Sequence, residues 1–375
     1  MGDDRRQTWR RGWGWIAPLL TLQSLALHAE EPDVDVGGYV AAGIDHYQAF
    51  YDADGDAQTT RGVLRSAKLE LELDWGNHWS AEIDANLKVG GGDPEGSLGD
   101  AYVRYRGEGG LETTLGRFKE PFGLERLSSY ANISTSERSV ATSAFAPGRS
   151  QGVMVGQFRQ SLTWSVGAFT EEPEGGSAHA VTGRITAASS SDQQTLHIGV
   201  AGSWRDLDGE PFQIKDRGEV FSADNVLRSP RFEARDSALV GLEGAWLRGR
   251  LSVTGELLAQ QVTRENGEHW RFGGAYVQTG VFLTDHRRRY RRGGLKAPNS
   301  VGGTGALELV GRYSAVDLRD RGIGAEATIA LVGINYYLGE QLQLRLNWLI
   351  PDIEGNRLMA NADGDALTLR VVYRF

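Results

Sequence analysis

The chain ends with DALTLRVVYRF, from Asp365 to Phe375, and this stretch decides the class of fold. Apolar side chains occupy every second position and polar or charged side chains mostly fill the positions between them. One face would carry Leu367, Leu369, Val371, Tyr373 and Phe375, and the other Thr368, Arg370 and Arg374. A period of two predicts a β-strand with one apolar face and one wet face.

The same alternation recurs in KLELELDW (68–75), WSAEIDANLKV (79–89) and LQLRLNW (342–348). A soluble sandwich would bury these apolar faces against a second sheet. Several segments instead run about ten residues or more and carry aromatic residues near their ends, as strands of outer-membrane barrels do. The terminal aromatic Phe375 is also typical of outer-membrane proteins. The pattern therefore favours a transmembrane barrel over a soluble β fold.

Short turn signals alternate with longer polar stretches, which is the topology of a closed antiparallel β-barrel. We expect about sixteen strands, because bacterial barrels have an even number. The predicted starts exceed that number by one, and the short segment at Phe212 is the first suspect. The starts lie near Val36, Arg61, Trp79, Asp100, Leu111, Gln151, Leu162, His179, Leu196, Phe212, Leu239, Leu251, Arg271, Gly305, Glu326, Leu342 and Ala366.

Residues 1–29 have the features of a secretory signal peptide. Four arginines precede the apolar stretch WGWIAPLLTLQSLAL, and Ala29 ends a cleavage site before EEPD. The apolar run is short and broken by Pro18 and Gln23, which argues against a membrane anchor. The sequence thus predicts export and a barrel domain over 30–375, located in the outer membrane of a Gram-negative bacterium.

Composition excludes several classes of function. The chain has no cysteine, which removes disulfides, thiolate metal sites and cysteine nucleophiles. Its histidines show no metal-ligand spacing, and no nucleophile elbow or phosphate-binding glycine loop is present. We therefore expect no metal, no cofactor, no nucleic-acid partner and no enzymatic activity. The net charge of −9 describes the whole surface and does not decide the selectivity of a pore.

A family resemblance is carried by GRFKEPFGLERLSS (116–129), ERS (137–139) and PGRSQGV (147–153). It continues through GAYVQTGVFLTDHRRRYRR, GALELVGRYSAVDL and VGINYYLGEQLQLRLNW, so it covers nearly all of the chain after residue 29. The chain resembles the phosphate-selective porin O and P family. That resemblance implies a trimer of sixteen-stranded barrels and an extracellular loop, here 125–150, folded into the lumen with basic residues that guide anions.

Basic residues fall into three groups that could bind anions along a pore. Arginine suits phosphate because its planar fork donates two hydrogen bonds at once, and several moderate sites allow release. The first group lies around the 125–150 loop, the second in PFQIKDRGE and the third in DHRRRYRR. The predicted pore-lining residues are Arg117, Lys119, Arg126, Arg138, Arg149, Lys215, Arg217, Arg287 and Arg289, with Asp100 as an acidic neighbour that the resemblance places near the lysine.

Some of these assignments have competing interpretations. If Leu111 and Leu115 face lipid, strict alternation also points Arg117 and Lys119 outward, at about 2–4 kcal/mol per charge near the midplane. A bulge at Gly116 or an early end of the strand before Pro121 would resolve this, with Lys119 pointing into the lumen. Other basic residues could act differently: RRRYRR could bind lipopolysaccharide, and Arg126 and Arg149 could brace the loop against carboxylates.

The sequence predicts passive diffusion of anions, namely phosphate or polyphosphate, through a pore lined by arginine and lysine. Its expected partners are these anions, outer-membrane lipid with lipopolysaccharide, and two further copies of the chain. A weakly selective general porin is the main alternative, because Glu70, Glu72, Asp74, Glu82 and Asp84 would make one wall acidic. An outer-membrane enzyme and a plugged structural barrel are further alternatives.

Overall fold

The computed structural model describes residues 31–48, 51, 58–90, 92–170, 178–298, 305–355 and 364–375. The predicted signal peptide, residues 1–29, lies outside these ranges. Sixteen antiparallel strands in the described ranges form a closed barrel, because β1 pairs with β2 on one side and with β21 on the other. The all-β fold class and the strand number are therefore confirmed.

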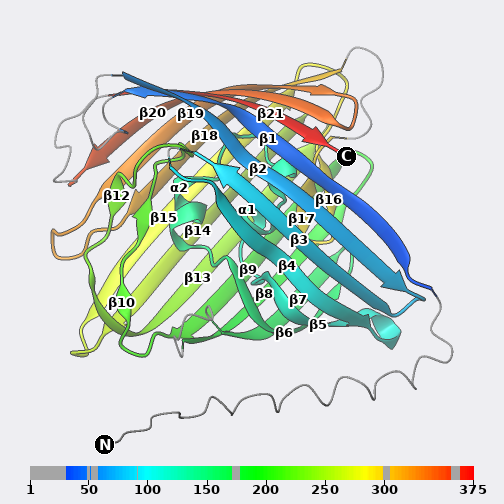
Figure 1. Cartoon of the computed structure of the whole chain (residues 1–375), viewed down its shortest axis with the longest axis horizontal. Helices are drawn as coiled ribbons and strands as arrows, with labels where there is room; N and C mark the ends of the chain where they lie inside the picture. Colours follow the sequence, from blue (N-terminus) through cyan, green and yellow to red (C-terminus); the bar gives the residue numbers. More distant parts are fainter. Residues whose placement is uncertain are drawn as a thin grey trace, which may run out of the picture.

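The wall of the barrel runs in sequence order around its circumference (Figure 1). Its strands are β1 (Asp33–Gln48), β2 (Gln58–Trp75), β3 (Trp79–Val89), β4 (Glu95–Arg106), β5 (Leu111–Lys119), β6 (Arg149–Phe158), β7 (Leu162–Thr170), β8 (His179–Ser190), β9 (Gln194–Asp206), β13 (Phe232–Arg248), β14 (Leu251–Arg264), β15 (His269–Phe282), β18 (Ala306–Asp317), β19 (Glu326–Leu338), β20 (Leu342–Glu354) and β21 (Ala366–Arg374).

Shorter elements lie in the connections. They are η2 (Glu108–Gly110), α1 (Leu124–Leu127), η3 (Tyr130–Asn132), α2 (Val140–Phe145), β10 (Pro211–Phe212), β11 (Lys215–Asp216), β12 (Leu227–Arg228), β16 (Arg289–Arg291) and β17 (Gly294–Lys296). The surplus strand start at Phe212 belongs to the two-residue β10, which pairs with the first two residues of β13. None of the helices in the described ranges is long and apolar enough to cross a membrane.

The two faces of the strands differ as the alternation predicted. In β21, Leu367 and Leu369 are 44% and 40% exposed on the outside, whereas Thr368 and Arg370 are fully buried. The outward face of the whole wall carries large apolar side chains, as a surface in contact with lipid requires. The inward face carries buried polar and charged residues, and also apolar side chains such as Leu258 and Ile329, which belong to one cluster with Phe122 and Val140 of the connection between β5 and β6.

A single charge on the outer face should measure this arrangement. Val332 lies in the middle of β19 and is 59% exposed, so Val332→Arg is expected to destabilise the barrel by about 2–4 kcal/mol. Leu338→Arg at the end of the same strand should cost only about 0–1 kcal/mol, because the side chain reaches the interface. Guanidinium unfolding in lipid vesicles measures both. Equal free energies for the two variants would contradict a lipid-facing surface.

The connections at the two ends of the barrel differ in length. The start of β1, the end of β21 and short turns such as 76–78 and 339–341 share one end, which is the periplasmic end of such barrels. The extracellular end carries two long connections, 120–148 between β5 and β6 and 207–231 between β9 and β13. We refer to these as the 120–148 loop and the 207–231 loop.

Candidate functional site

The 120–148 loop begins where the β5 ladder cannot continue. Pro121 has no N–H to donate and Gly123 adopts φ +73°, a conformation that favours glycine. Short helices α1, η3 and α2 follow, and the Ser139 hydroxyl accepts a hydrogen bond from the N–H of Thr142 at 3.1 Å to cap α2. In Figure 1 the helices α1 and α2 are drawn within the outline of the barrel.

Side chains of distant strands hold this loop in place. Both carboxylate oxygens of Glu256, on β14, accept backbone hydrogen bonds from Leu124 and Glu125 at the start of α1, at 3.0 and 2.7 Å. Asn347 on β20 accepts from the N–H of Ser136 at 2.6 Å. The loop is therefore bonded to β14 and β20, which do not neighbour β5 or β6 in the sheet.

Arg312 on β18 is the most connected of these anchors. Its fully buried guanidinium pairs with Glu125 at 3.3 Å and with Glu219 of the 207–231 loop. It also donates to the Thr135 hydroxyl at 2.9 Å and to the carbonyl of Glu137 at 3.1 Å. One wall residue thus joins both loops.

The 207–231 loop is fixed to the wall on the opposite side as well. Asp45 on β1 accepts from the N–H and the hydroxyl of Ser222 at 3.1 and 2.9 Å. The Tyr47 hydroxyl donates to the carbonyl of Ser222 at 3.1 Å. Asp45 is itself paired with Arg370 of β21 at 2.6 Å. This loop therefore extends from β9 and β13 to β1 and β21.

A cavity of about 230 Å³ lies between the two loops. It is lined by five basic side chains and three acidic ones, together with Ser143, Val220, Phe221 and Asn225. The basic residues are Arg65, Arg126, Arg138, Lys215 and Arg217, and the acidic ones are Glu137, Asp216 and Glu219. Two of the three predicted basic groups, from the 125–150 region and from PFQIKDRGE, thus meet at one cavity.

Three predicted residues are bonded to backbone carbonyls: Arg126 and Arg138 at the cavity, and Lys119 beside the start of the 120–148 loop. Among the described residues, no carboxylate forms an ion pair with Lys119, Arg126 or Arg138. They donate to backbone carbonyls instead, and the Ser128 carbonyl accepts from both the Lys119 amine at 3.4 Å and the Arg138 guanidinium at 2.9 Å. Burial, aided by Arg138, lowers the pKa of Arg126 to about 10. Glu125, Asp216 and Glu256 offset part of the positive charge of Arg126 without pairing with it, so its guanidinium group remains free of a direct carboxylate partner among the described residues.

Arg149 and Asp100 form an ion pair instead of facing the cavity. The Arg149 guanidinium pairs with Asp100 at 2.6 Å and with Asp84 at 3.7 Å, which fits the bracing role considered for Arg149. Along β5, Arg117 follows the outward-facing Leu115, which is 65% exposed, and directly precedes the buried Phe118. The pairing of β5 with β4 and β6 shows no register shift at Gly116, so the proposed bulge is absent. The strand instead ends at Lys119, whose amine reaches the loop carbonyls.

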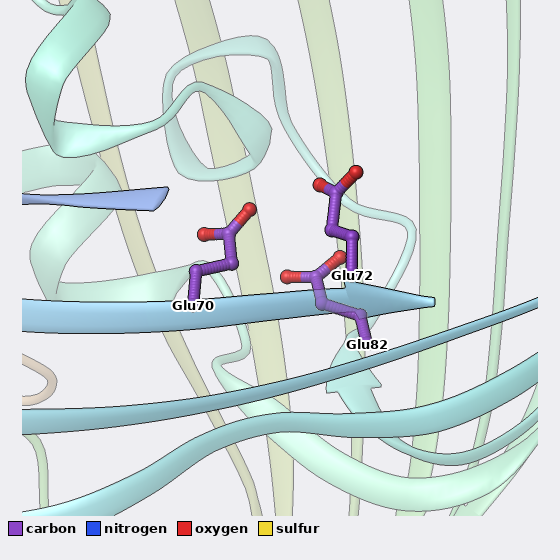
Figure 2. A group of neighbouring side chains, drawn as sticks. All are labelled: Glu70, Glu72 and Glu82. Carbon is purple, nitrogen blue, oxygen red and sulfur yellow. The ribbon is translucent and has the colours of Figure 1, made fainter. Parts of the chain in front are cut away.

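The acidic wall that the sequence predicted lies on β2 and β3. Figure 2 shows the carboxylates of Glu70, Glu72 and Glu82 gathered together, and their oxygens lie within 4.8 Å of one another. Lys68 pairs with Glu70 and lies 3.9 Å from Glu82, so one ammonium already supplies positive charge to this group. The cluster could hold a cation, but it does not hold the 120–148 loop.

The third basic group lies at the periplasmic end, between β15 and β18. Arg287 donates to the carbonyl of Asp192 at 2.7 Å and Arg289 to that of Ala297 at 2.9 Å. Arg288, which was not among the predicted pore residues, is buried and pairs with Glu308 at 2.8 Å. Lipopolysaccharide occupies the outer leaflet, so this placement does not support the interpretation of RRRYRR as a lipopolysaccharide site, which stays a prediction.

Arg65 is a cavity residue that the sequence analysis missed. It is the extra residue of a β-bulge in β2, since the pairing with β1 and with β3 shifts register at this point. Strict alternation counted back from Lys68 points Arg65 outward, whereas the bulge lets its guanidinium pair with Glu137 at 2.6 Å. No sequence signal marks this bulge.

Asp216 should make anion selectivity depend on pH. Burial raises the pKa of this loop carboxyl to about 6, so it is ionised at pH 7 and protonated at pH 5. The folded protein then binds this proton more tightly than the unfolded chain, and acidification through pH 6 both stabilises the loop and removes a negative charge from the cavity. We expect chloride-over-potassium selectivity, measured as a reversal potential, to rise in that interval.

Asp216→Asn is the control for this titration. It should remove the step near pH 6 and leave the selectivity at its acidic value. An unchanged pH profile in this variant would show that another group is responsible.

The chain matches a known family over almost its whole described length. The model of the phosphate-selective porin O and P family covers residues 34–375. The chain belongs to this family. Membership identifies the protein as an outer-membrane porin, a channel and not an enzyme.

Relatives and solved structures agree with this assignment. Porin O of Pseudomonas aeruginosa is 24% identical over 387 residues, which cover 91% of this porin and 88% of that protein. An uncharacterized protein of Caulobacter vibrioides is 27% identical over 329 residues, which cover 80% of this porin but only 65% of that protein. The anion-selective porin of Comamonas acidovorans has the same fold, with a TM-score of 0.57 and 15% identity over 92% of this chain and 100% of that one.

Proposed function

We propose that this porin conducts anions, phosphate or polyphosphate in particular, through a lumen narrowed by the 120–148 and 207–231 loops. The observation that carries this proposal is the group of cations at the meeting of the two loops that has no carboxylate partner. Lys119, Arg126 and Arg138 are held by carbonyls and form no ion pair among the described residues, so a permeating anion could pair with them directly. Wall contacts through Glu256 and Asn347 support an inward position of the 120–148 loop.

The arrangement offers several moderate sites in place of one deep one. Lys215 and Arg217 approach the cavity from the 207–231 loop, whereas Arg126 and Arg138 approach it from the 120–148 loop. Arg287 and Arg289 would extend the cationic path at the periplasmic end. An anion that exchanges between such groups can bind well enough to enter and weakly enough to leave, which passive diffusion requires.

Planar-bilayer recording tests the proposal. In a potassium chloride gradient the reversal potential should favour chloride, and added phosphate should block the chloride current. A reversal potential that favours potassium would reject the proposal, and no conductance at all would reject a channel.

A weakly selective general porin is the second candidate, and the acidic cluster of Glu70, Glu72 and Glu82 favours it. It predicts a reversal potential near zero with no block by phosphate. The proposal further includes export by residues 1–29, assembly as a trimer in outer-membrane lipid and polyphosphate as a second substrate. Its support for a trimer is the family resemblance and the fold shared with OmpT of Vibrio cholerae, solved in a trimer form at a TM-score of 0.58 and 9% identity.

A further inference from the structure

Phe221 occupies a special place in the cavity between the two loops. Its ring lies 4.7 Å from the guanidinium carbon of Arg65 and 5.8 Å from that of Arg217. The same guanidinium carbon of Arg65 lies 4.8 Å from the centre of the Tyr130 ring, which belongs to the 120–148 loop. Cation–π attraction thus links the side chains of both loops and of the β2 wall into one stack.

The backbone around Phe221 is held firmly in an unusual conformation. Arg217 donates to the carbonyl of Phe221 at 2.6 Å, and the next residue, Ser222, is bonded to Asp45. Glu219 adopts φ +65°, although it is not a glycine. Its buried carboxylate accepts from the N–H of Val140 at 2.7 Å and pairs with Arg312. Such a conformation is unfavourable for a residue with a side chain and persists only where the surroundings fix it.

Gly90, just after β3, forms the other boundary of the ring. A Cβ added at Gly90 would overlap the Phe221 ring, so the aromatic side chain packs directly on the backbone there. The ring is thereby wedged between this backbone and Arg65. The bonds of the 217–222 turn and this contact together fix the position of the ring.

The size of the cavity indicates what this wedge does. At about 230 Å³ the cavity is smaller than the sites of small organic molecules, which measure about 300–1,000 Å³. Most of its charged lining comes from long, adaptable side chains, whereas Phe221 is a rigid apolar ring in a fixed turn. We infer that Phe221 sets the upper size limit of the solute: small inorganic oxyanions pass, and phosphates that carry a sugar are excluded. This inference rests on the proposed anion conduction.

Permeability of inorganic phosphate and of glucose 6-phosphate, measured in vesicles containing the full chain, tests the inference. Wild type should pass phosphate and exclude glucose 6-phosphate. Phe221→Ala should raise the ratio of glucose 6-phosphate to phosphate permeability by at least about tenfold, the lower end of what a single pocket contact contributes to discrimination. Phe221→Leu, which keeps an apolar side chain on Gly90, should give an intermediate ratio and serves if the alanine variant does not fold.

Phe212→Ala is the matched control, since Phe212 lies in the same loop but stacks on Phe272 and Phe232, away from the cavity. It should keep the wild-type ratio. An unchanged ratio in both Phe221 variants would overturn the inference, as would free passage of glucose 6-phosphate through wild type. Cation preference in the potassium chloride gradient would instead reject the proposed function, so the two failures are distinguishable.

Discussion

Replacing both Lys119 and Arg138 with glutamine is expected to abolish most of the block of chloride current by phosphate. Glutamine can still donate to the Ser128 carbonyl that both residues share, but it carries no charge. A hydrogen bond to a charged group contributes about 1.5–3 kcal/mol, so each replacement should weaken phosphate binding by about 10- to 100-fold. Titration of the block in planar bilayers measures the change.

Arg248→Gln is the control for this experiment. Arg248 lies exposed at the periplasmic end of β13, far along the strand from both loops, and its loss should leave the block unchanged. Wild-type block in the double variant would show that the anion binds elsewhere. The basic groups at the periplasmic end, Arg287 and Arg289, would then be the next residues to replace.

Arg312→Met is expected to have the largest effect on stability. The substitution removes the buried guanidinium that joins both loops and leaves Glu219 and Glu125 without their positive partner. Breaking a buried ion pair from one side destabilises by about 3–5 kcal/mol. We expect lower resistance to guanidinium unfolding, a larger single-channel conductance, and faster tryptic cleavage within the 120–148 loop.

Two further variants separate this effect from a general loss of charge. Arg319→Met removes a half-buried arginine just beyond the end of the same strand, and its surface ion pairs should contribute about 0–1 kcal/mol. Adding Glu219→Gln to Arg312→Met should restore part of the lost stability, because it removes the unpaired carboxylate. Equal stabilities of the Arg312 and Arg319 variants would contradict the anchoring role.

The wall of the barrel could be predicted because each strand carries its own pattern. The alternation around Leu367 and Thr368 indicates one apolar and one polar face of the strand, and it can be seen in that strand alone, without information on the neighbouring strands. Even the surplus start at Phe212 was identifiable, because a strand of two residues cannot span a bilayer. Local periodicity is sufficient wherever the environment alternates between lipid and water.

The site could be predicted only in part, because its geometry depends on contacts between distant segments. Charge and a family resemblance identified Arg126, Arg138, Lys215 and Arg217, which line one cavity. Arg65 was missed because a bulge in β2 turns its side chain toward the interior, whereas strict alternation points it outward. The anchoring by Glu256, Arg312 and Asn347 left no local signal, since an inward polar residue has the same pattern whether it bonds a loop or faces water.

The segment between β15 and β18 gives the pore a second support. Its Arg288 donates to the carbonyl of Asn132 at 2.7 Å, and its Ala297 N–H to the Asn132 side chain at 3.2 Å. The segment at the periplasmic end therefore contacts the 120–148 loop at Asn132, and Arg288 also donates to the Ser134 hydroxyl. Lengthening or shortening either segment would displace the other through this contact. A change in the β15–β18 segment is therefore expected to offset the effect on the pore of a change in the 120–148 loop.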